Sequence, residues 1–94
     1  MAVACLKCSA TLEKPVAGIS ICPRGDEIIC TYYLCAACDV WTVERFYDAF
    51  MGDSWAKCEG PYPRVSGDKD VAKIRSCPTP HDKMCSCKVH EEWM

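Results

Sequence analysis

Hydrophobic residues along the chain form short blocks that are separated by turn-forming residues. Residues 16–22 alternate loosely and are rich in β-branched side chains, so they predict a strand. Residues 27–34 are the strongest strand candidate because they are rich in Ile, Thr and Tyr. Residues 40–47 predict a third strand by the same composition. Pro23 to Asp26 predicts a turn, since Pro fixes φ and Gly permits a positive φ. The pattern therefore predicts a three-stranded antiparallel meander.

The second half of the chain has a weaker hydrophobic pattern. Residues 48–66 contain several glycines and prolines, and they predict an irregular loop. Residues 68–77 predict a short helix, because their apolar positions recur every three residues and share one face. Asp68 or Ser66 would cap the start of this helix, and Pro78 would end it. An irregular, cysteine-rich tail follows.

Chain length and cysteine content change this picture. Ninety-four residues form a single domain, residues 1–94, whose hydrophobic core is marginal on its own. Ten cysteines in such a chain indicate that metal or disulfides supply the missing stability. The N-terminal residues lack the basic stretch, apolar core and cleavage site of a secretory signal. We therefore expect a cytoplasmic protein, and in a reducing compartment cysteines bind metal rather than form disulfides.

Two C-x-x-C pairs carry the strongest chemical signal: Cys5/Cys8 and Cys35/Cys38. Zinc takes four tetrahedral ligands, with sulfur at about 2.3 Å, so one pair cannot complete the shell and two pairs can. The predicted hairpin between the pairs would return the chain and bring them together. Ser9 and Asp39 follow the pairs, at positions where metal knuckles often need a positive φ.

These pairs, Cys5-Leu-Lys-Cys8 and Cys35-Ala-Ala-Cys38, resemble zinc ribbons and rubredoxin-like folds over residues 5–47. The resemblance implies a small, metal-stapled α+β fold. Its zinc-ribbon-like half, residues 1–47, would be the three-stranded sheet, and residues 48–94 would hold the loop, the helix and the tail. Neither pair has the Pro and Gly of rubredoxin knuckles (C-P-x-C-G), which favours zinc over iron. Iron at this site and a redox-active dithiol are the alternatives, although the latter needs a βαβ setting.

Five further candidate ligands lie within fourteen residues near the C-terminus: Cys77, His81, Cys85, Cys87 and His90. We expect a second zinc site made of Cys77, Cys85, Cys87 and His90, because the C-x-C-x-x-H cluster is compact. In this site Cys77 would be held at the end of the predicted helix. His81 is the main alternative to His90, and Cys58 could complete the shell from the loop.

Cys22 and Cys30 lie on the two strands of the predicted hairpin. Free cysteine packs as a small apolar residue, so the core is the expected place for both side chains. A third metal site that combines them with a spare histidine is the alternative.

Charge and motifs narrow the range of functions. The formal net charge is −2, and thiolate-bound zinc would make it more negative, which argues against nucleic-acid binding. The longest apolar run, residues 28–38, is too short to cross a membrane. The sequence has no Gly-rich phosphate loop, G-x-S-x-G or H-E-x-x-H motif. A catalytic zinc needs an open position, which the C-terminal site would have only if His90 does not bind.

We therefore expect a non-enzymatic module with two structural zinc ions that acts by binding another protein. One alternative is a rubredoxin-like iron protein that transfers electrons. Another is a metal- or redox-responsive protein with a labile C-terminal site. Besides Tyr32 and Tyr33 of the predicted strand at residues 27–34, the chain has seven aromatic residues, which are more rings than a small core needs. An exposed group of them would mark a surface that binds a partner.

Overall fold

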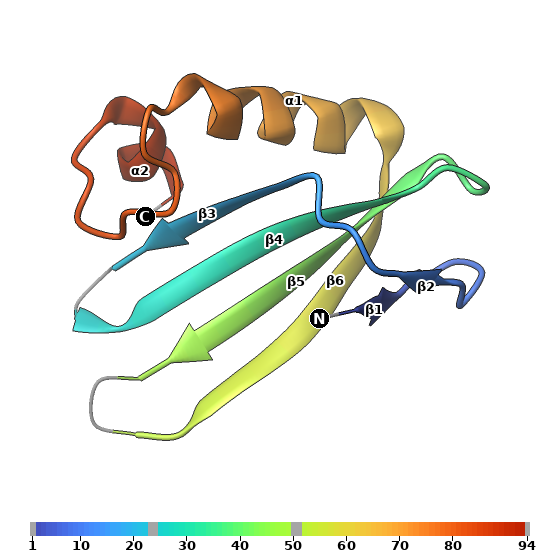
Figure 1. Cartoon of the computed structure of the whole chain (residues 1–94), viewed down its shortest axis with the longest axis horizontal. Helices are drawn as coiled ribbons and strands as arrows, with labels where there is room; N and C mark the ends of the chain where they lie inside the picture. The colour runs from blue at the N-terminus through green and yellow to red at the C-terminus, as the bar shows by residue number, and fades with distance from the viewer. Residues whose placement is uncertain (1, 23–24, 50–51, 94) are drawn as a thin grey trace.

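The structure is a computed structural model that describes residues 2–22, 25–49 and 52–93. Within these ranges the chain forms a four-stranded antiparallel sheet, a separate two-stranded sheet and two helices (Figure 1). The elements in chain order are β1 (Val3–Ala4), β2 (Thr11–Leu12), β3 (Ala17–Ile21), β4 (Glu27–Cys35), β5 (Val40–Asp48), β6 (Ser54–Pro63), α1 (Arg64–Ser76) and α2 (Lys88–Trp93). The class is therefore α+β.

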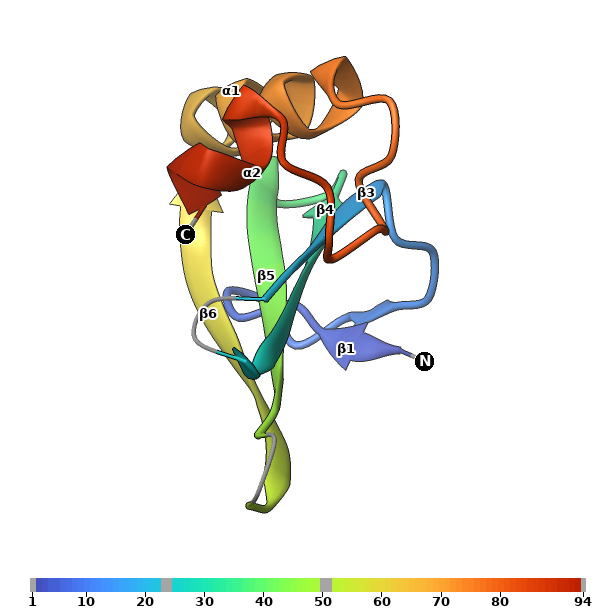
Figure 2. The same ribbon diagram turned by 90° about the vertical axis from the view of Figure 1, so that its left-hand side faces the viewer.

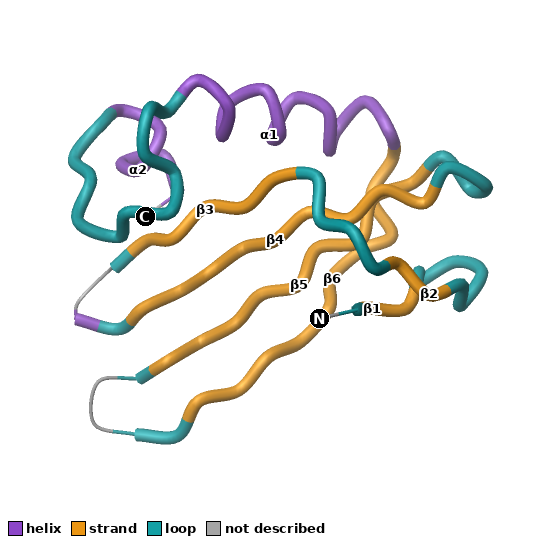
Figure 3. The backbone as a smooth tube through the Cα atoms, in the orientation of Figure 1, coloured by secondary structure: helices purple, strands orange, loops and turns teal. Residues whose placement is uncertain are grey.

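The larger sheet is a meander in which each strand pairs with the next, in the order β3-β4-β5-β6 (Figure 3). The predicted strands at residues 16–22, 27–34 and 40–47 correspond to β3, β4 and β5, and their ends differ by one residue at most. Of the predicted turn, Pro23 and Arg24 lie outside the described residues. The second C-x-x-C pair falls in the tight connection between β4 and β5.

The prediction of a loop over residues 48–66 is wrong, because β6 occupies most of that range and the sheet has four strands rather than three. β6 is an exposed edge strand, so its sequence shows no alternation of buried and exposed positions. Pro61 and Pro63 fit such an edge because an edge strand leaves amide positions that need no partner. Gly60 has a φ of 123°, near the register shift between Trp41 and Val43.

Helix α1 begins at Arg64, four residues before the predicted start at residue 68. Neither Ser66 nor Asp68 caps it; Pro63 occupies the N-cap position, without a side-chain cap bond. Proline lacks an amide hydrogen and its ring restricts φ, so it can lead directly from the strand into the first turn. The helix ends at Ser76, one residue before the predicted end at residue 77 and two before Pro78.

The core lies between one face of the larger sheet and α1 (Figure 2). It is built from the following buried side chains: Ile19, Ile21, Cys30, Tyr32, Trp41, Val43, Val71 and Ile74. Gly67 allows the close approach of α1, because a Cβ there would overlap the indole ring of Trp41. Tyr32 also donates a hydrogen bond from its hydroxyl to Asp70 Oδ2 at 3.0 Å, which ties the sheet to the helix.

The small elements lie at opposite ends of the molecule (Figure 1). At one end, the β1–β2 unit packs on the sheet face opposite α1, where the Leu6 amide donates to Thr42 Oγ1 at 3.3 Å. At the other end, α2 packs Val89 and Trp93 against the core. Among the described residues, neither helix is long and apolar enough to span a membrane.

Candidate metal centres

The first cluster joins the β1–β2 connection to the β4–β5 connection. It contains the thiols of both C-x-x-C pairs: Cys5, Cys8, Cys35 and Cys38. The four Sγ atoms all lie within 4.8 Å of one another, and Cys8 Sγ lies 3.8 Å from Cys35 Sγ. Four sulfur atoms at about 2.3 Å from a tetrahedral zinc ion would be about 3.8 Å apart. The spacing therefore suits one zinc-sized ion.

The two knuckles of this cluster have the same backbone geometry. The Ser9 amide donates to the Cys5 carbonyl at 2.9 Å, and the Asp39 amide donates to the Cys35 carbonyl at 2.8 Å. Ser9 has a φ of 66° and Asp39 a φ of 58°, so the expected positive φ occurs after both pairs. The Lys7 amide also points to Cys5 Sγ at 3.4 Å. Such turns place both sulfur atoms of a pair on the same side of the backbone.

Electrostatics distinguish the thiols within the first cluster. The backbone amides of Cys8 and Lys7 lower the pKa of Cys5 to about 7. Hydrogen bonding with the Cys8 thiol, together with burial, raises the pKa of Cys38 to about 12. One thiol thus ionises readily while another keeps its proton, as expected where thiolates share a small volume. A divalent cation at the centre would offset this repulsion and favour four thiolates.

The second cluster lies where the end of α1, the following loop and α2 meet. Its members are those of the expected second site: Cys77, Cys85, Cys87 and His90. Their ligand atoms also lie within 4.8 Å of one another. Cys77 Sγ is 3.8 Å from Cys85 Sγ and 3.3 Å from Cys87 Sγ. Burial raises the pKa of Cys77 to about 11, whereas the Thr79 hydroxyl lowers the pKa of Cys85.

His90 is fully buried and directs its Nδ1 at the thiols. Nδ1 lies 3.4 Å from Cys77 Sγ and 3.2 Å from Cys87 Sγ, so the imidazole can complete a shell of three sulfur atoms and one nitrogen. Nε2 is buried as well, and no acceptor for it is found among the described residues. Histidines that bind metal usually donate this second N–H to a carboxylate or carbonyl, which fixes the ring.

The remaining candidate ligands lie outside both clusters. His81 is exposed on the loop after α1, and Cys58 is exposed on β6. Cys30 is buried in the core, as expected, and Cys22 is half-buried at the end of β3. Within the described part of the chain, no group of potential ligands includes Cys22 or Cys30.

Sequence reasoning missed the contacts that connect the first cluster to α1. Arg64 Nη1 lies 2.7 Å from Asp39 Oδ1, and Arg64 Nε lies 2.9 Å from Asp68 Oδ1. The i, i+4 spacing of Arg64 and Asp68 could have indicated the second ion pair. The first depends on the course of β6, which the sequence does not predict.

Comparisons with protein-family models, with curated proteins and with solved structures find no match to this chain. The two clusters of cysteine and histidine ligands are therefore the observation on which a functional assignment depends. Each contains the ligand number and the ligand types of a closed tetrahedral zinc site. A shell in which all four bind has no open position for a substrate.

Proposed function

We propose that this protein is a small zinc module in which both clusters hold a structural ion, and that it acts in the cytoplasm by binding another protein. The observation that carries the metal assignment is the convergence of four ligand atoms within 4.8 Å at each of two places. Closed shells of four thiolates, or of three thiolates and one imidazole, are typical of structural zinc.

The structural role follows from where the ligands lie. The first cluster fixes the β1–β2 unit, which has only two paired residues in each strand, to the larger sheet. The second fixes the loop and the six-residue helix α2 to the end of α1. Neither peripheral unit has a core of its own, so metal binding energy would become folding energy there. The two C-x-x-C knuckles, each at a connection between two strands, also support the zinc-ribbon resemblance.

Exposed apolar side chains on and beside β6 support the partner-binding role. Trp55 and Tyr62 lie on this edge strand, and Val65 follows in the first turn of α1. Trp55 is 49% exposed although its ring stacks on Tyr47 at a centroid distance of 4.1 Å. Exposed aromatic residues on an unpaired strand edge are typical of protein-binding surfaces.

Native mass spectrometry with elemental analysis tests the metal assignment directly. We expect two zinc ions per chain, and we expect a strong chelator to abolish the cooperative thermal transition seen by circular dichroism. A chain that keeps its fold after complete metal removal would overturn the structural role. A coloured protein with iron in the first cluster would instead favour electron transfer.

A further inference from the structure

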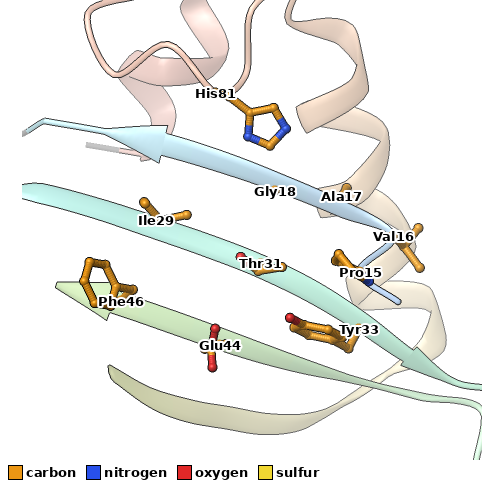
Figure 4. A pocket seen from close by; sticks show the side chains of 10 residues that line it. All are labelled: Pro15, Val16, Ala17, Gly18, Ile29, Thr31, Tyr33, Glu44, Phe46 and His81. Carbon is orange, nitrogen blue, oxygen red and sulfur yellow. The ribbon is translucent and has the colours of Figure 1, made fainter. Parts of the chain in front are cut away.

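A hollow of about 540 Å³ lies on the sheet face opposite α1 (Figure 4). Its floor consists of side chains from β4 and β5 that alternate with the core positions: Ile29, Thr31, Tyr33, Glu44 and Phe46. The volume falls within the range of about 300–1,000 Å³ found for small-molecule sites. The hollow is separate from both cysteine clusters, because none of their members lines it.

His81 forms one wall of the hollow, at the edge of β3 (Figure 4). Its Cε1 atom lies 3.4 Å from the position that a Cβ on Gly18 would take, so the ring lies within van der Waals reach of β3. The Ser20 amide donates to the Pro80 carbonyl at 2.8 Å and ties the loop to this edge. The loop is bounded by Cys77 and Cys85 of the second cluster. Metal there would hold His81 in place, a point that rests on the proposed function.

Glu44 gives the hollow its charge. It is half-buried and is the acidic residue of the lining, whose other members are largely apolar. Within the described part of the chain, no Lys, Arg or His nitrogen comes within 4.0 Å of its carboxylate. A carboxylate that is partly removed from water is stabilised by a paired cation. An apolar body on that cation would bury its surface against the apolar lining. The net charge of −2 favours cations as well.

We propose that the hollow binds a small molecule that carries an apolar or aromatic body and a single cationic amine. The body packs on the rings of Tyr33 and Phe46 and on Ile29, and the amine pairs with Glu44. His81 closes the side at the β3 edge. The site is therefore a specific amine site on a metal-stapled sheet, distinct from the metal centres themselves.

Titration of the 94-residue, zinc-loaded chain tests this proposal, with binding followed by amide NMR. Three matched probes share one ring and differ in charge: phenethylamine, phenethyl alcohol and phenylacetate. We expect the amine to shift the amide signals of Gly18, Thr31 and Phe46 saturably. The alcohol should bind about three- to fivefold more weakly, and phenylacetate more weakly still. The proposal is overturned if no saturable shift occurs around the hollow, or if phenylacetate binds as tightly as the amine.

Two variants test whether the amine pairs with Glu44. Glu44→Gln should lower the affinity for phenethylamine to that for the alcohol and leave alcohol binding unchanged. Glu13→Gln, at an exposed carboxylate outside the hollow, is the matched control and should change neither. An amine preference that survives Glu44→Gln would contradict the assigned pairing.

Cys85→Ser tests whether the loop that carries His81 contributes to binding in the hollow. We expect it to weaken both the amine and the alcohol, because the loop that carries His81 loses an anchor, and unchanged binding would contradict the role of the loop. Elemental analysis of the same samples separates the two proposals. A chain that holds no zinc but prefers the amine through Glu44 would overturn the proposed function and leave the amine site standing.

Discussion

The two cysteine clusters differ in the sequence separation of their ligands and in the hydrogen bonds that hold those ligands in place. The first joins residues 5–8 to residues 35–38 through two knuckles whose backbone bonds are equivalent. The second takes all four ligands from residues 77–90, and its histidine leaves Nε2 without an acceptor among the described residues. A long-range, well-supported site should therefore govern stability, whereas a local, less supported site should exchange metal more easily.

Removal of a ligand should have the largest effect and should separate the clusters. We expect Cys35→Ser and Cys85→Ser each to reduce the zinc content to one ion per chain in native mass spectra. Cys35→Ser should also lower the unfolding free energy by several kcal/mol, because a structural zinc contributes about 10–16 kcal/mol in small zinc domains.

Cys58→Ser is the control for both variants, since Cys58 is exposed and lies outside the clusters. It should keep two ions and the wild-type thermal transition. If either cluster variant retains two zinc ions, the corresponding ligand assignment is wrong.

Helix α1 links the two clusters, so a change in its packing should affect both ends. We expect Gly67→Ala to destabilise the fold by about 1–3 kcal/mol, because the added methyl overlaps the Trp41 ring. Urea unfolding measures this effect. Ser66→Ala, at the exposed neighbouring position, should change stability by less than about 0.5 kcal/mol. Equal effects of the two substitutions would show that α1 does not pack closely on Trp41.

Metal release should occur in two phases. We expect a chelator with a chromogenic readout to remove zinc from the second cluster about tenfold faster or more, since outer contacts to a ligand are worth about 10–100-fold in affinity. The Cys85→Ser variant should lack the fast phase. If it lacks the slow phase instead, the order of the two sites is reversed.

The knuckle backbone should show the smallest effect. Asp39 adopts a φ of 58°, so Asp39→Ala should cost about 1–2 kcal/mol. Asp39→Gly should cost less, because glycine adopts this conformation freely and the ion pair that both variants lose is on the surface. Thermal unfolding of the two zinc-loaded variants gives the comparison, and a more stable Ala variant would contradict the assigned backbone geometry.

The sequence predicts best those features that depend on local chemistry. Strands β3 to β5 contribute most of their residues to buried or half-buried positions, so their apolar, β-branched composition indicates them. The cysteine spacings indicate which ligands gather. The sequence does not predict β6, because an exposed edge strand tolerates Gly60, Pro61 and Pro63, which normally mark loops. The start of α1 is missed for the same reason, since it follows directly from that strand. The hollow at Glu44 depends on strand register and on the loop after α1, which no single segment encodes.

The compact spacing of the second cluster also has a consequence for the order of assembly. Its ligands span residues 77–90, so a chain segment of this length can close around an ion before the sheet has formed. The first cluster can bind an ion only after the β3–β4 hairpin has brought its two C-x-x-C pairs together, and the pairing of distant segments is slow. On refolding with zinc, the site that fills first should therefore also be the one that empties first.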